Sequence, residues 1–262
     1  MIDIKDRQGF ERFWGKWKRQ LSSLVTGTGG KLLCPEQGDM SFTETEDGFE
    51  VKPKYPVCFF SIPQKNSSAS DKLVVFIDGT FEFRKGSQKG EAATLTSTHS
   101  NVAFFKPRAD AESLKLDLID AYHFDHFNED PLKSAPHPVF HAQRNIRTDD
   151  TFGKFRQALK ENNKNSEIID MDQKRKNDLF GLKTFRLPTP QIDLFSLSAI
   201  LAADHLTGQC QTNSKTYKSF KDFLDCISDT SVQAIQLSHQ NVTRAELADH
   251  SHRFVWKWYS RH

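Results

Sequence analysis

The chain has 262 residues, of which 37% are hydrophobic and 27% charged, and 22 residues are phenylalanine. This composition excludes a disordered chain and is typical of a folded protein with an aromatic core. The net charge of +2 permits contact with nucleic acid but does not indicate a dedicated binder, which usually concentrates far more positive charge.

The sequence carries no sign of a cysteine zinc site or of a membrane anchor. Cys34, Cys58, Cys210 and Cys226 are widely scattered and form no C-x-x-C pair, so we interpret them as reduced thiols. Residues 1–6 lack the apolar centre of a secretory signal, and no run approaches the ~18 apolar residues of a membrane span. We therefore expect a soluble cytoplasmic protein with no membrane span.

An amphipathic helix is predicted over residues 6–25, because its apolar residues recur at helical spacing and form one broad stripe. Gly27 and the pair Gly29-Gly30 end this helix. The stripe consists of Phe10, Phe13, Trp14, Trp17, Leu21 and Leu24.

From residue 39 to residue 147 the apolar pattern changes to period two, which is typical of strands. Asp47-Gly48 is a strong hairpin signal, and we interpret Asp78-Gly79 as a second turn. Short polar turns between successive strands favour an antiparallel meander. We expect strands over residues 41–45, 49–52, 57–62, 73–77, 81–84, 94–105, 114–127 and 138–146.

After residue 150 helical spacing returns, around an exposed connection over residues 161–178. The predicted fold class is α+β: an N-terminal helix, an antiparallel β-meander sheet, and a C-terminal helical bundle packed on one face of the sheet. The expected division is residues 1–148 for the helix and sheet and residues 149–262 for the helical region. The absence of βαβ alternation and of a Walker A or G-x-G-x-x-G motif disfavours a Rossmann-type nucleotide site.

The densest chemistry in the sequence lies in residues 122–127 and 136–144, which hold four of the ten histidines. Imidazole both titrates near neutral pH and binds borderline metals. If residues 114–127 form a regular strand, His123 and Asp125 share one face, about 6–7 Å apart at the backbone. The opposite, core-facing side of this strand would carry Leu114, Leu116, Leu118, Tyr122 and Phe124.

His137 and His141 have the spacing of a zinc-binding helix, but Pro136 and Pro138 oppose a helix there. In an extended segment the two imidazoles would lie about 13 Å apart, too far to share one zinc ion. We therefore expect His141 to join the first segment across a hairpin, on the face away from Leu116, Leu118 and Phe124. The predicted catalytic set is His123, Asp125, His141 and Gln143, with Arg144 and His137 as substrate-binding residues.

Two interpretations of this cluster remain open. The residues could hold a divalent metal through His123, Asp125 and His141, or they could work as an acid/base pair with no metal. Alternatively, they could be cross-strand hydrogen-bond partners in a half-solvated sheet.

The aromatic-His-aromatic-Asp sequence and the histidines that follow it, within residues 121–144, are similar to small bacterial proteins of toxin–antitoxin and phage-defence loci. No activity is carried over from that resemblance.

The sequence supports two functional hypotheses. The first is a bacterial enzyme that acts on a phosphodiester or nucleotide substrate through His123, Asp125 and His141. The second is a non-catalytic component of a bacterial defence or toxin–antitoxin type system that binds protein or nucleic acid. Residues 14–19 and 254–262 interleave aromatic with basic side chains, which suits base stacking. For residues 14–19, packing in the core is the stronger interpretation, because Trp14 and Trp17 belong to the apolar stripe.

Overall fold

The computed structural model describes ten parts of the chain. Its described residues are 7–63, 72–86, 93–109, 113–126, 140–143, 153–159, 167–168, 186–188, 193–207 and 215–228.

The described residues include ten strands, which join in one sheet in the order β1-β4-β5-β6-β7-β8-β10. The pair β2 and β3 extends the sheet beside one end of β5, and β9 pairs with β7. All of these pairings are antiparallel except that of β9 with β7. The strands are β1 (Lys31–Leu33), β2 (Met40–Glu44), β3 (Gly48–Pro53), β4 (Val57–Pro63), β5 (Lys72–Arg84), β6 (Thr94–Ala109), β7 (Ser113–His126), β8 (Phe140–Gln143), β9 (Glu167–Ile168) and β10 (Arg186–Pro188).

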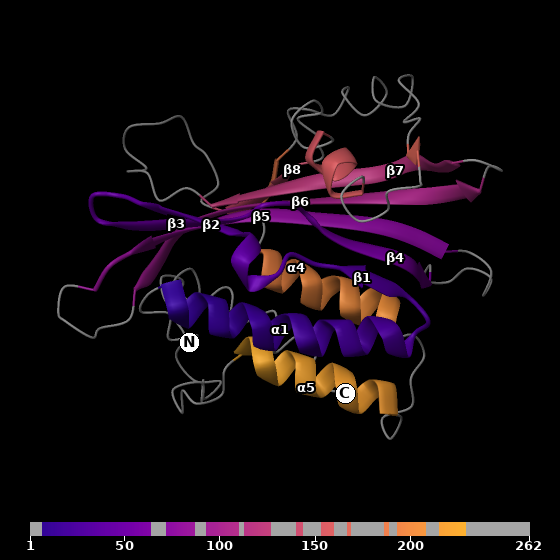
Figure 1. Ribbon diagram of the computed structural model, residues 1–262, viewed down its shortest axis with the longest axis horizontal. Helices are drawn as coiled ribbons and strands as arrows, with labels where there is room; N and C mark the ends of the chain where they lie inside the picture. The colour runs from indigo at the N-terminus through magenta and orange to yellow at the C-terminus, as the bar shows by residue number, and fades with distance from the viewer. Residues whose placement is uncertain are drawn as a thin grey trace.

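A layer of helices covers one face of the sheet, which we call the α1-side face (Figure 1). It consists of α1 (Arg7–Gly27), α4 (Leu194–Leu201), its continuation as the π-helical turn η3 (Ala202–Leu206), and α5 (Lys215–Ser228). Helix α4 packs on β5 and β6, and α5 packs on α1. A 3-10 turn, η1 (Gln37–Asp39), leads from β1 toward β2. The predicted α+β class is therefore confirmed for the described residues.

Helix α1 forms where its apolar stripe predicts it, and every residue of that stripe is buried. Trp14 and Trp17 are both fully buried. Their indole N–H groups still find acceptors: that of Trp14 donates to the Pro35 carbonyl at 2.9 Å and that of Trp17 to Ser198 Oγ at 3.0 Å. Buried indoles in this arrangement serve packing, so neither ring is available to stack on a base.

The second face of the sheet, the far-side face, is covered by the helical residues 153–159 (Figure 1). Phe155 stacks on Phe76 of β5 with ring centroids 4.4 Å apart. Together with Ala158 and Leu159 it completes a separate far-side core with residues of β4, β5, β6 and β7. The described helices after residue 149 thus lie on both faces of the sheet, and the expectation that they all pack on one face is wrong. The helical spacing of the sequence also predicts one or two final helices from about residue 231 to residue 258, and these lie outside the described residues.

Strand β5 runs without interruption through Asp78-Gly79, so the turn predicted there is wrong. The glycine is present because the α1-side face is closely packed at this position. A Cβ atom at Gly79 would lie 3.1 Å from the His99 carbonyl oxygen and 3.2 Å from Leu194 Cβ. Glycine is needed here because helix α4 approaches the strand closely, and not because the chain reverses.

Strand β7 contains one extra residue, Ile119. Its neighbours Leu118 and Asp120 pair with consecutive residues of β6, so Ile119 has no opposite residue, and its side chain is 40% exposed. Such a bulge reverses the alternation of side chains beyond it.

The consequence of this bulge is visible in the packing of β7. Leu118 and Ala121 both belong to the far-side core, whereas Tyr122 and Phe124 pack on the α1-side core. Position 123 therefore lies on the face of Leu116 and Leu118. The prediction that the histidine cluster faces away from Leu116 and Leu118 is wrong, and only its placement opposite Phe124 holds.

Two strands come from the region that we expected to be helical. β10 pairs with β8, and β9 pairs in parallel with β7. The sheet therefore includes residues from both sides of residue 148, and the division into two regions at that point remains a prediction.

Replacement of Trp17 by alanine should lower the free energy of unfolding by about 3–5 kcal/mol, because it leaves a large cavity and removes the hydrogen bond that Ser198 Oγ accepts. Denaturant unfolding followed by circular dichroism measures this loss. The exposed Lys16→Ala on the same helix is the matched control and should change stability by less than about 0.5 kcal/mol. A loss below about 1 kcal/mol for Trp17→Ala would contradict a core position for this ring.

Candidate functional site

Two neighbouring rows of residues cross the far-side face where its apolar core ends, and we call them the polar rows. Antiparallel register partners lie on the same face of a sheet. The last apolar row is Phe76, Ala103 and Ala121. The first polar row follows two residues further along β5 and consists of Asp78, Asn101, His123, Gln143 and Arg186. The second consists of Thr80, His99, Asp125, His141 and Pro188.

The four residues predicted to be catalytic occupy adjoining positions in these rows. His123 is the register partner of Gln143, and Asp125 is the partner of His141. Directly opposed Cβ atoms in such pairs are about 4.5–5.5 Å apart, and diagonal positions such as 123 and 141 are about 7–8 Å apart. The hairpin pairing expected from the sequence is thus present in the backbone, and the positions of both histidines belong to one face. Arg144 and His137 lie outside the described residues.

The sequence-based set lacks six residues of the polar rows: Asp78, Thr80, His99, Asn101, Arg186 and Pro188. Three of them either pair with β7 or carry a buried carboxyl group. His99 is the partner of Asp125 on the side opposite His141, and Asn101 is the partner of His123. Both are half-buried. Their strand was predicted, but its register against β7 is a tertiary property that the alternation within one strand does not contain. The third residue, Asp78, was assigned to a turn because Asp-Gly is a frequent turn pair.

Asp78 is a buried carboxyl group at the end of the first polar row. Its side chain is 7% exposed, and its atom Oδ1 has no hydrogen-bond partner among the described residues. The ammonium nitrogen of Lys154 lies 3.6 Å from Oδ2, which is an ion-pair distance but too long for a hydrogen bond. Lys154 comes from the same helical residues that place Phe155 on Phe76, so one segment provides both the apolar cover and the charged partner.

Burial raises the pKa of the Asp78 carboxyl above its usual range. The ammonium groups of Lys154 and Lys52 and a hydrogen bond from the Gly79 N–H act in the opposite direction. Desolvation disfavours the charged form more strongly than these partners favour it. A buried carboxyl with a raised pKa and a positive partner is a feature that often marks a functional site.

The cysteines do not contribute a nucleophile to the described part of the chain. Cys34, Cys58 and Cys226 are buried free thiols. Burial raises the pKa of the Cys58 thiol, and likewise that of Cys34, well above the ordinary value. Because the thiolate is the reactive form, these two groups are inert near neutral pH. The thiol state predicted from the sequence is confirmed for these three cysteines, and Cys210 lies outside the described residues.

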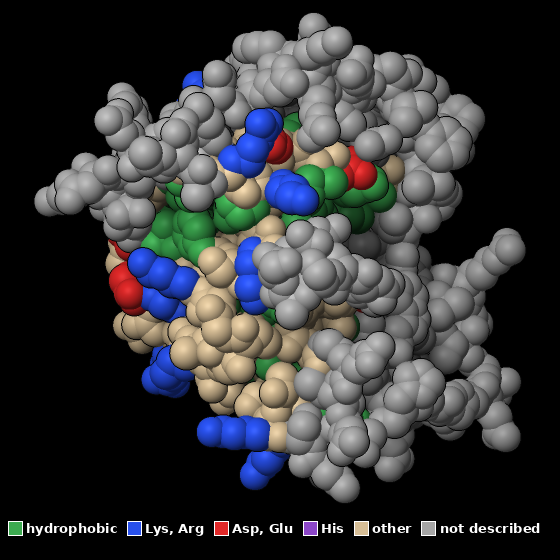
Figure 2. Space-filling model, turned by 90° about the vertical axis from the view of Figure 1, so that its right-hand side faces the viewer, with side chains coloured by type: hydrophobic (Ala, Val, Ile, Leu, Met, Phe, Trp, Pro, Cys, Tyr) green, Lys and Arg blue, Asp and Glu red, His purple; other side chains and the backbone are tan. Residues whose placement is uncertain are grey.

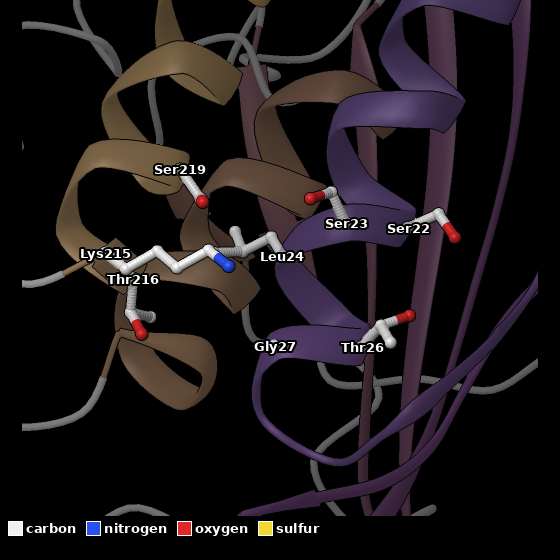
Figure 3. Close-up of a pocket in the computed structure, with 8 residues that line it drawn as sticks. All are labelled: Ser22, Ser23, Leu24, Thr26, Gly27, Lys215, Thr216 and Ser219. Atoms are coloured by element: carbon white, nitrogen blue, oxygen red, sulfur yellow. The ribbon is translucent and has the colours of Figure 1, made fainter.

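A hollow of about 460 Å³ lies between the end of α1 and the start of α5. Figure 3 shows the hydroxyl groups of Ser23 and Ser219 directed toward one another across it, with the Lys215 chain extended toward Leu24. No imidazole and no carboxylate lines this hollow, so its described lining offers no acid/base chemistry. It is lined by Ser22, Ser23, Leu24, Thr26, Gly27, Lys215, Thr216 and Ser219.

The basic side chains are spread over the surface in the view of Figure 2. The described lysines and arginines there are distributed over the whole visible face, and some of them lie beside acidic side chains. This distribution agrees with the small net charge and differs from the concentrated basic patch of a typical nucleic-acid binder.

In the described residues, no three His, Cys, Asp or Glu side chains come together as a metal-binding group. A metal held by His123, Asp125 and His141 remains a prediction, since the side chains of Asp125 and His141 are not described. None of the described helices is long and apolar enough to cross a membrane. No protein-family model, curated protein or solved structure matches the chain.

The raised pKa of Asp78 predicts a pH-dependent effect of Asp78→Asn on stability. The penalty for burying the charge is absent below the unfolded-state pKa of about 3.9 and grows as the pH rises toward the folded-state pKa. The asparagine variant carries no such penalty. Its free energy of unfolding, relative to wild type, should therefore increase with pH over this interval and then become constant.

Urea unfolding at a series of pH values measures this difference. Asp47→Asn, which removes the same charge from an exposed position, controls for the change in net charge. A relative stability of Asp78→Asn that stays constant or decreases as the pH rises would show that the folded state does not disfavour the carboxylate.

Proposed function

We propose that this protein is an enzyme that acts on a phosphodiester or nucleotide substrate, with His123 and His141 as its acid/base pair. The observation that carries the proposal is the register of β7 against β8, which sets His123 opposite Gln143 and Asp125 opposite His141. Two imidazoles at diagonal positions, about 7–8 Å apart at Cβ, leave room for a scissile group between their rings.

In the proposed reaction, one imidazole accepts a proton from the attacking water or hydroxyl as its oxygen bonds to phosphorus. The other imidazole donates a proton to the leaving oxygen as the bond from that oxygen to phosphorus breaks. Asp125, between the positions of His99 and His141, orients a neighbouring imidazole and stabilises its protonated form. Gln143 would hold a phosphate oxygen through its amide, and Arg144 and His137 are the proposed substrate contacts.

A metal-dependent version of this proposal uses the same residues differently. His123, Asp125 and His141 would then hold a divalent metal, with ligand atoms about 2.0–2.2 Å from it. Elemental analysis of the purified protein separates the two versions. A metal that is present in stoichiometric amount in the wild-type protein and absent from both His123→Ala and His141→Ala supports the metal-dependent version. An active wild-type protein without metal supports the acid/base version.

The variants His123→Ala and His141→Ala should each abolish hydrolysis of a phosphodiester, because acid/base groups contribute factors of about 10² to 10⁴ in rate. Their melting temperatures should stay close to that of the wild-type protein, because polar positions at a sheet surface contribute little to folding. The assay uses bis-(p-nitrophenyl) phosphate and single-stranded RNA and DNA oligonucleotides, with thermal unfolding of each variant measured in parallel.

His205→Ala is the matched control for this experiment. It removes a half-buried imidazole from the α1-side layer, where His205 Nδ1 lies 3.2 Å from the Pro63 carbonyl oxygen, and should leave the activity intact. If His123→Ala or His141→Ala unfolds the protein, the histidines are structural. Wild-type protein without hydrolytic activity would favour the alternative function, a protein- or nucleic-acid-binding component of a bacterial defence or toxin–antitoxin type system.

A further inference from the structure

The buried oxygen Oδ1 of Asp78 has no hydrogen-bond donor within the described part of the chain. A buried polar atom without a partner loses its hydration and gains nothing in exchange, which makes such atoms rare in folded proteins. A ligand that brings a hydroxyl or amino group to Oδ1 would supply the missing hydrogen bond.

The pairing of β5 with its neighbours on one side is interrupted beside Asp78. On one side of β5, the register with β4 ends at the pair Val57–Ile77, and the register with β3 begins at Val51–Phe81. Residues 78–80 therefore have no register partner on that side among the described strands. Lys52 continues β3 from Val51 toward this break, and its charge acts on the Asp78 carboxyl.

Charged and polar groups approach Asp78 from three directions. The Lys154 ammonium comes from the helical cover and Lys52 from β3, and Asn101 is the register partner on β6. A ligand bound at this point would meet an acceptor in Asp78 and donors in the lysines. This combination suits a group that carries a hydrogen-bond donor next to an acceptor, as the edge of a nucleobase or the hydroxyls of a sugar do.

The spacing to the histidines fits the same kind of ligand. Asp78 and His123 lie in one row and are separated by two strand spacings, which is roughly 10 Å at the backbone. A nucleotide is about that long from its phosphate to the far edge of its base.

We propose that Asp78 and Lys154 form a subsite that binds a hydrogen-bond-donating group of a nucleotide whose phosphate lies at His123 and His141. This subsite rests on the proposed function for its ligand class. Asp78 accepts the hydrogen bond from the base or sugar through Oδ1, and Lys154 contacts the neighbouring acceptor.

Calorimetric titration of guanosine monophosphate into wild-type protein and Asp78→Asn tests this subsite. The asparagine keeps the shape of the side chain but turns one acceptor into a donor, so guanosine monophosphate should bind about 10-fold more weakly or worse. Inorganic phosphate, which reaches only the histidine end, should bind both proteins equally. Asp47→Asn is the control for the loss of charge. Lys154→Met should weaken the binding of guanosine monophosphate by a smaller factor, and it provides a second test of the subsite if Asp78→Asn does not fold.

Two further ligands identify which group meets Asp78. Dideoxyguanosine monophosphate lacks both sugar hydroxyls, and purine riboside monophosphate has a base without an N–H donor. If Oδ1 binds the sugar, Asp78→Asn should no longer affect the first ligand, and if it binds the base, Asp78→Asn should no longer affect the second. Equal affinity of wild type and Asp78→Asn for guanosine monophosphate, or no binding by the wild type, would overturn the subsite.

The outcome also separates the subsite from the proposed function. If the protein hydrolyses no phosphodiester but Asp78→Asn selectively lowers its affinity for the nucleotide, the subsite is supported and the proposed enzyme activity is not. If hydrolysis depends on His123 but the nucleotide affinity of Asp78→Asn is unchanged, the proposed enzyme activity is supported and the subsite is not. A parallel loss of phosphate and nucleotide binding in Asp78→Asn counts against the subsite, because it indicates a general disturbance of the site.

Discussion

The structure depends on β5 being buried on both faces. This strand pairs with β3, β4 and β6, and its side chains alternate between two cores. Val75 and Ile77 point into the α1-side core, and Val74 and Phe76 into the far-side core. A strand enclosed in this way fixes the register of its neighbours, because a slip of one residue would exchange the contents of the two cores. The placement of Asp78, and through it of the first polar row, follows from this constraint.

The two helical covers are held by aromatic contacts to this strand. On one face, Phe195 of α4 stacks on Phe81 at 5.0 Å and meets Phe13 of α1 at 4.7 Å. On the other, Phe155 stacks on Phe76. Along the far-side face of β5, the apolar side chains of Val74 and Phe76 are followed by the buried carboxyl of Asp78, which lies 3.6 Å from the ammonium of Lys154 in the same helical cover. Electrostatic interactions are stronger in such a low-dielectric environment than in water.

Much of this arrangement could be predicted from the sequence, and the failures have identifiable causes. Helix α1 and the strands of residues 39–147 were predicted because amphipathic periodicity reports burial directly. Asp78-Gly79 was misinterpreted because the close approach of Leu194 to Gly79, not a turn, requires the glycine. The prediction of the face on which His123 lies was partly wrong, because a single bulged residue, Ile119, reverses the alternation of side chains along β7. His99 could not be assigned to the cluster, since its alignment with Asp125 is fixed by the pairing of whole strands.

The hydrogen bond between Trp17 and Ser198 joins residues 181 positions apart in the sequence, which has a consequence for the biosynthesis of the protein. At about 5–20 residues per second, the ribosome needs roughly 10–40 s to make the intervening chain. During that time the aromatic stripe of α1 has been made, but α4 and α5, which bury it, have not. The nascent chain therefore lacks the α4 and α5 contacts of the two tryptophans and two phenylalanines of this stripe until its last third emerges, and transiently exposed apolar surface of this kind is what chaperones bind.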